Sequence, residues 1–161
     1  MSHNQGKSGI KLYMVGTGAV GKHAIAVALT ENRFKTEYFS CVFDESRIDM
    51  LFDGDPIVIW LRTTSGQEDY DRLRKLWYPD TDAFIVCYCQ TRPTSLTLTE
   101  EKFVPDFREQ RPDAPFLLVG TFADVATEEK TVQFASAKRM GRKLGAACVL
   151  ECSSKTQVGM T

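Results

Sequence analysis

The chain has 161 residues, 43% of them hydrophobic and 25% charged, which suits one globular domain with a full core. Its 20 basic and 21 acidic side chains nearly balance, so no general field would collect nucleic acid or anionic lipid. Five cysteines without a repeating framework favour reduced thiols, and no apolar run approaches the ~20 residues that span a bilayer. We expect one cytoplasmic domain, residues 1–161, with a flexible N-terminus at residues 1–9.

Strands and helices are predicted to alternate along the chain. Apolar runs predict five strands, at Ile10–Val15, Pro56–Leu61, Ala83–Cys89, Phe116–Val119 and Ala147–Leu150. Helical patterns occur at Ala24–Leu29, around Phe103 and Phe107, and within Thr127–Gly145, where Gly145 is a natural left-handed stop. The alternation predicts an α/β fold with a mostly parallel central sheet and helices on both faces.

A glycine-rich loop separates the first predicted strand from the first helix. Gly16–Lys22 fits GxxxxGK, in which backbone amides and the helix N-terminus surround phosphate oxygens while Lys22 brings a full charge. A dinucleotide-type GxGxxG overlaps at Gly16, Gly18 and Gly21, but Lys22 favours a nucleoside phosphate. The next position normally carries the Ser or Thr that binds Mg²⁺, and here it is His23, whose imidazole suits a hydrogen bond to phosphate or a solvent-facing position.

The segment Ser65–Arg74, with the sequence SGQEDYDRLR, resembles the second switch of Rho-family small GTPases. The resemblance begins at Ser65-Gly66-Gln67-Glu68-Asp69-Tyr70-Asp71-Arg72-Leu73-Arg74 and continues through Leu76, Tyr78-Pro79 and Thr81-Asp82. The first switch is similar at Phe34, Glu37-Tyr38 and Val42-Phe43-Asp44, and the guanine-recognition segments at Leu118-Val119-Gly120-Thr121, Asp124 and Glu151-Cys152-Ser153. The motifs occur in the family's order over nearly the whole chain, which implies a P-loop small-GTPase fold that binds GTP and GDP.

The resemblance also implies roles for individual residues. Asp124 would accept hydrogen bonds from the guanine N1 and exocyclic amine, Phe34 would pack near the base, and Gln67 would orient the attacking water as the catalytic residue. Gly18 would leave space for an arginine finger. The nucleotide-binding candidates are Gly18, Ala19, Val20, Gly21, Lys22, His23, Ala24, Phe34, Tyr38, Gly66, Thr121, Asp124, Ser153, Ser154 and Lys155.

Three departures from the family pattern affect the Mg²⁺ site. The family's P-loop hydroxyl, switch threonine and aspartate are replaced by His23, Cys41 and Thr63. Losing all three removes the oxygen ligands that orient the ion, so we assign no metal ligands and expect impaired hydrolysis. The alternative is that Cys41 is a small apolar substitute and Thr63 still binds the ion through water.

Other departures affect the base site and the end of the fold. Phe122 stands where the family has a lysine that covers the guanine and braces the phosphate loop. The Rho insert helix, the last helix of the fold and a lipidated C-terminal motif are not expected in this sequence. We therefore expect either a truncated form or a sheet face that a partner or second copy covers, and no membrane anchor in this chain.

Two functions compete on these grounds. The first is an atypical Rho-like switch that recruits effectors and regulators through Phe39–Asp44 and Tyr70–Tyr78, with a role in the actin cytoskeleton. The second is a pseudoGTPase binding module that docks partners without nucleotide cycling. Trp77, where the family has a small residue, would extend the partner site or pack on its own helix, whereas Arg72, Arg74 and Lys75 are expected to be a solvated face rather than a nucleic-acid patch.

Overall fold

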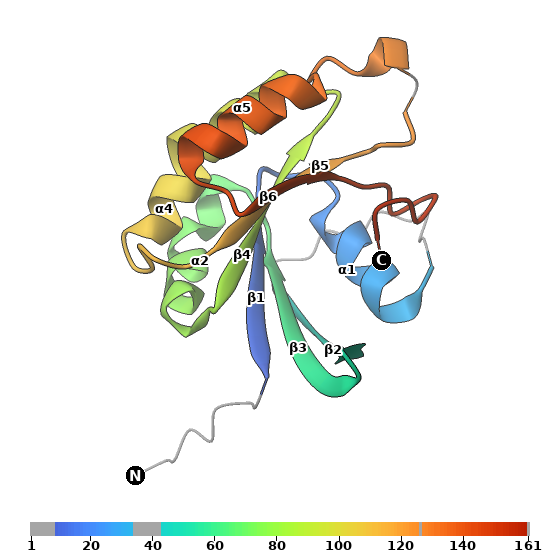
Figure 1. The fold of residues 1–161 in the computed structure, drawn as a ribbon. Helices are drawn as coiled ribbons and strands as arrows, with labels where there is room; N and C mark the ends of the chain where they lie inside the picture. The colour runs from blue at the N-terminus through green and yellow to red at the C-terminus, as the bar shows by residue number, and fades with distance from the viewer. Residues whose placement is uncertain (1–8, 34–42, 126, 161) are drawn as a thin grey trace.

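The computed structural model describes residues 9–33, 43–125 and 127–160. Six strands form one sheet in the order β2-β3-β1-β4-β5-β6 (Figure 1). They are β1 (Ile10–Val15), β2 (Phe43–Phe52), β3 (Asp55–Thr64), β4 (Ala83–Cys89), β5 (Phe116–Thr121) and β6 (Cys148–Glu151). Only β2 runs antiparallel to its neighbour, so the predicted mostly parallel α/β sheet is confirmed.

Helices follow the strands as the alternating pattern predicted. The α-helices are α1 (Lys22–Glu31), α2 (Asp71–Trp77), α3 (Pro93–Leu98), α4 (Val104–Arg108) and α5 (Phe134–Leu144). Short turns of other helix types occur at Glu68–Tyr70, Tyr78–Asp80 and Thr127–Glu129, and a π turn at Thr99–Phe103 joins α3 to α4. The wider turn precedes Pro105, whose ring and missing N–H disfavour regular α-helical bonding at that point.

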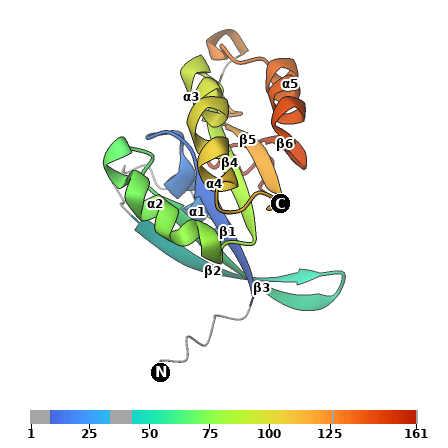
Figure 2. The same ribbon diagram turned by 90° about the vertical axis from the view of Figure 1, so that its left-hand side faces the viewer.

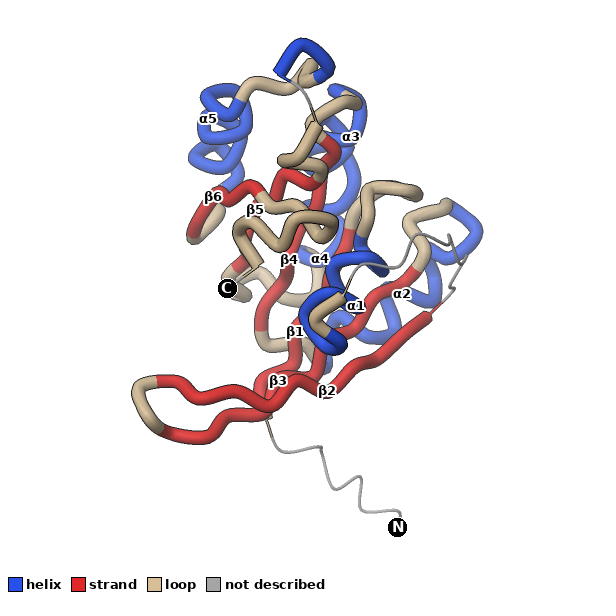
Figure 3. The backbone as a smooth tube through the Cα atoms, turned by 90° about the vertical axis from the view of Figure 1, so that its right-hand side faces the viewer, coloured by secondary structure: helices blue, strands red, loops and turns tan. Residues whose placement is uncertain are grey.

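The helices lie on both faces of the sheet. Helices α2, α3, α4 and α5 cover one face, where an aromatic core includes Phe107 stacked on Phe84 with ring centroids 4.0 Å apart (Figure 2). Helix α1 lies on the other face, where Ile25 and Ala26 pack on Met14 and Leu61 (Figure 3). Parallel strands covered on both faces are apolar throughout, which explains the unbroken apolar run of β4.

The face that carries α1 is covered less completely than its opposite. No helix follows β6 within the described residues, and residues 152–160 form turns from which Met160 packs against the α1 side of the core. Ile10 and Leu150 are each 42% exposed. None of the helices among the described residues is long and apolar enough to cross a membrane.

The sequence did not predict β2, which is the longest strand together with β3. Its charged residues Asp44, Arg47 and Asp49 break the apolar pattern because β2 is the edge of the sheet. The usable signal was Asp53-Gly54, whose positive φ values of 50° and 88° form the tight turn into β3.

Only the second part of the predicted segment Thr127–Gly145 forms an α-helix. Helix α5 begins at Phe134, because the backbone N–H groups of Thr131 and Val132 both donate to the carbonyl of Gln90 instead of joining a helix. The predicted stop is confirmed, since Gly145 is left-handed with φ of 79°.

Candidate functional site

Loops from four parallel strands meet at one edge of the sheet. The carboxyl ends of β1, β4, β5 and β6 are neighbours in the sheet, so the segments that follow them lie together. Ligands of open α/β sheets bind at this edge. It brings the predicted phosphate loop, Gly16–Lys22, close to the predicted base-recognition residues Asp124 and Ser153.

The phosphate loop has the backbone form that its glycines predicted. A Cβ added to Gly16 would lie only 2.6 Å from the carbonyl oxygen of Cys87, so this position requires glycine. Ala19 and Gly21 are left-handed, with φ of 58° and 88°. Left-handed residues at every second position turn successive backbone amides toward one point, which forms an anion-binding nest. Helix α1 adds its positive N-terminus at Lys22.

Lys22 is buried within this loop. Its Nζ donates to the carbonyl oxygens of Gly16 and Thr17 at 2.8 and 2.7 Å. Burial lowers the pKa of Lys22 from 10.5 to about 8, because an ammonium group loses hydration there. A bound phosphate would stabilise the ammonium charge that burial destabilises. The loop therefore favours binding of an anion.

Two of the three expected metal positions, His23 and Thr63, lie among the described residues. His23 Nδ1 lies 3.5 Å from Asp44 Oδ2 at the start of β2, and it presents no oxygen. Thr63 is buried in β3, where it pairs with Met14 and Asp44. Among the described residues, no three His, Cys, Asp or Glu side chains lie close enough to share an ion. Cys41 lies outside the described residues.

The predicted second switch packs directly on the phosphate loop. Gly66 is buried there, and a Cβ at this position would lie 2.1 Å from the carbonyl oxygen of Gly16. Gln67 is exposed, and its Cγ would lie 3.9 Å from a Cβ added to Gly18. The structure therefore places the candidate catalytic side chain beside the loop.

Arg74 holds the second switch in this position. It is fully buried, its Nη1 donates to the carbonyl oxygens of Ser65 and Gln67 at 2.7 and 3.2 Å, and it forms an ion pair with Asp71. The expectation that Arg74 belongs to a solvated face was wrong, because these carbonyls need a buried donor. Arg72 and Lys75 are exposed as expected.

The base-recognition candidates gather at the ends of β5 and β6. Ser153 Oγ donates to Asp124 Oδ1 at 2.7 Å, and the backbone N–H of Ala123 donates to the carbonyl of Cys152 at 3.0 Å. Thr121 is buried, with its hydroxyl on the carbonyl of Tyr88. These contacts fix the exposed Asp124 carboxylate at the same edge as the phosphate loop.

The remaining candidates divide between the site and the undescribed segments. Val20 is buried under the loop and Ala24 lies in the first turn of α1. The Ser154 carbonyl accepts a bond from Gln157, and Lys155 is exposed. Phe34 and Tyr38 lie outside the described residues, as do residues 39–42 of the partner segment and residues 1–8 of the predicted N-terminus.

One residue at this edge was missed by sequence reasoning. Arg92 Nη2 donates to the carbonyl oxygens of Gly18 and Ala19 at 3.1 and 2.9 Å. The available signal was its position, three residues beyond the carboxyl end of β4, at the edge where the loops meet.

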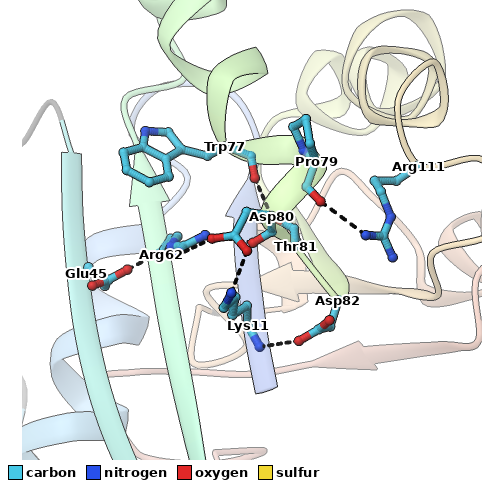
Figure 4. A network of polar contacts seen from close by, with 9 residues as sticks. All are labelled: Lys11, Glu45, Arg62, Trp77, Pro79, Asp80, Thr81, Asp82 and Arg111. Carbon is cyan, nitrogen blue, oxygen red and sulfur yellow. Dashed lines mark hydrogen bonds and ion pairs between the residues drawn. The ribbon is translucent and has the colours of Figure 1, made fainter. Parts of the chain in front are cut away.

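Trp77 joins the two predicted partner segments. Its ring stacks on Phe43 with centroids 5.1 Å apart, and the Arg62 guanidinium lies 5.0 Å from the ring centroid. Arg62 also bonds to Glu45 at 2.7 Å and to the Asp80 carboxylate at 3.1 Å (Figure 4). Trp77 also packs against the aromatic core under the helices, so its ring contacts both its own side of the sheet and strands β2 and β3.

The comparison with known protein families agrees with this arrangement. A family model described as the Ras family matches residues 11–161, which include the phosphate loop, the second switch and the base-recognition loops. The match supports guanine-nucleotide binding and protein effectors or regulators as the ligands of such a domain. The chain therefore belongs to the Ras family of small GTPases, the signalling switches of the P-loop fold.

Proposed function

We propose that this chain is an atypical Rho-like GTPase with weakened Mg²⁺ coordination and hydrolysis, acting on the actin cytoskeleton. It binds GTP and GDP and uses Phe39–Asp44 and Tyr70–Tyr78 to contact effectors and regulators. The Rho assignment rests on the resemblance of the Ser65–Arg74 segment, and the weakened metal chemistry rests on the site itself. The single 161-residue domain acts in the cytoplasm.

The contact between His23 and Asp44 carries the proposal. The position that supplies a hydroxyl to Mg²⁺ in the family holds an imidazole, and its Nδ1 is directed at a carboxylate 3.5 Å away. Imidazole is a poor ligand for a hard cation that prefers oxygen. His23 and Asp44 thus join α1 to β2 through a direct side-chain contact.

The remaining residues support nucleotide binding better than turnover. Lys22 and the amides of the loop would hold the phosphates, while Asp124, fixed by Ser153, would hold the guanine. When bound, Mg²⁺ supplies charge neutralisation at the outer phosphates. Gln67 can orient a water molecule, but even complete sites of this class turn over at only about 10⁻⁴ per second unaided.

The test measures GDP and GTP affinity with and without Mg²⁺, followed by single-turnover hydrolysis. We expect the wild-type affinity to change less than about 10-fold on metal removal, because the oxygen ligands are missing. The matched variant carries His23→Ser, Cys41→Thr and Thr63→Asp, and should acquire metal dependence. Wild-type binding that tightens about 100-fold or more with Mg²⁺ and leads to turnover would overturn the proposal.

A second candidate is a binding module that docks partners without nucleotide cycling. The stack of Phe43 on Trp77 favours it, because this contact ties the two partner segments together with protein side chains alone. The discriminating observation is nucleotide content. A purified protein that contains no guanine nucleotide, and binds none in titration, but still binds its partner would replace the switch with the fixed module.

A further inference from the structure

Two cationic side chains hold four successive carbonyl groups of the phosphate loop. Lys22 binds the oxygens of Gly16 and Thr17, at 2.8 and 2.7 Å. Arg92 binds the next two, those of Gly18 and Ala19, at 3.1 and 2.9 Å. The loop carbonyls must be engaged away from the anion if the amides are to face it, so both contacts favour the binding form of the loop.

Hydrogen bonds hold the backbone of Arg92 in place. Its N–H donates to the carbonyl of Cys89 at 3.1 Å, and its own carbonyl accepts from the Ser95 N–H and Oγ, at 3.0 and 2.6 Å. Ser95 is 2% exposed and also accepts a bond from the N–H of Cys89. The exposed guanidinium therefore extends from a rigid turn between β4 and α3.

Phe122, which follows the neighbouring strand β5, cannot donate a hydrogen bond to the phosphate loop. Phe122 follows β5, which pairs with β4 through Cys89 and Thr121, and the family resemblance expects a loop-bracing lysine at this position. A phenyl ring donates no hydrogen bond to a carbonyl. It lies against the loop instead, 3.8 Å from where a Cβ of Gly21 would be.

We propose that Arg92 is the positioning residue that braces the phosphate loop in place of the lysine that Phe122 has replaced. The brace reaches the loop from the end of β4 rather than from the end of β5. It holds Gly18 and Ala19 and brings a positive charge behind the amides that receive phosphate. This inference rests on the proposed binding of guanine nucleotide.

The first experiment measures the release rate of a fluorescent GDP analogue from wild type and from Arg92→Ala. We expect release to accelerate about 10-fold, the effect of losing charge-assisted hydrogen bonds at a partly exposed site. The Arg92→Lys variant, which keeps one donor, should fall between them. The matched control is Arg111→Ala, because Arg111 also donates to a backbone carbonyl, that of Pro79 at 3.2 Å, but lies away from the loop.

A second pair of variants separates a brace from a general structural role. Adding Phe122→Lys to Arg92→Ala should slow release by a larger factor than adding Phe122→Lys to the wild type. Equal effects of Phe122→Lys in both backgrounds would mean that the residues do not share a role, and would overturn the inference. Unchanged release from Arg92→Ala would also overturn it.

Amide hydrogen exchange tests the brace without nucleotide. In the free protein, Arg92→Ala should speed exchange at Gly18–Gly21 while Arg111→Ala does not, because the loop loses its restraint. Unaltered exchange in the loop would refute the brace. If the wild type binds no guanine nucleotide, the proposed function fails, and the exchange measurement still decides whether Arg92 restrains the loop.

Discussion

The protonation of Lys22 should make nucleotide affinity depend on pH. Burial lowers its pKa to about 8 in the free protein, and a bound phosphate would return it toward its ordinary value of 10.5. The complex then holds its proton more tightly than the free site, so affinity falls as pH rises above 8. From about pH 7.5 to about pH 9.5, these two pKa values give a weakening of about 20-fold.

The assay is a titration with GDP at several pH values, combined with calorimetry in buffers of different ionisation enthalpy. Near pH 8.5, binding should take up about 0.75 proton, the difference in Lys22 protonation between the two states. Cys87 will not interfere, because burial raises the pKa of its thiol to about 12. The Lys22→Arg variant, whose charge does not titrate in this range, should show a smaller pH dependence than the wild type. A flat wild-type profile without proton uptake would refute the reasoning.

Three further predictions follow from contacts around the site. Gly66→Ala should lower the free energy of unfolding by about 1–3 kcal/mol, because the new methyl group meets loop backbone, whereas Gly18→Ala, which makes only an ordinary contact with Gln67, should have a much smaller effect. Chemical denaturation compares them, and equal losses would contradict the packing. Arg74→Met should speed proteolysis of residues 65–70 by releasing the Ser65 and Gln67 carbonyls, and unchanged cleavage would count against that anchor. Phe107→Ala should cost about 3–5 kcal/mol in calorimetry through loss of the stack on Phe84, and a cost below about 1 kcal/mol would be inconsistent with it.

Much of the fold was predictable because its signals are local. Strands β1 and β4 match their apolar runs residue for residue, and α5 ends at the glycine that predicted its stop. β2 was missed because an edge strand tolerates charge on its exposed positions, so the pattern of its side chains says little about its pairing with β3.

The candidate site divides in the same way. GxxxxGK and the Ser65–Arg74 segment specified the phosphate loop, Lys22 and Gln67, because close backbone approach demands particular residues at fixed spacing. The partners of His23 and Trp77 could not be predicted, since Asp44 and Phe43 come from a strand whose pairing was unknown.

The sequence by itself indicated a small GTPase and the order of its loops, because each depends on residue type at short spacing. Only the tertiary structure decided that Arg74 is buried, that His23 faces Asp44 and that Arg92 reaches the phosphate loop. His23 and Asp44 are 21 positions apart in the sequence, and Arg92 and Ala19 are 73 positions apart. Strand pairing in the sheet brings such residues together, and no local sequence pattern encodes it.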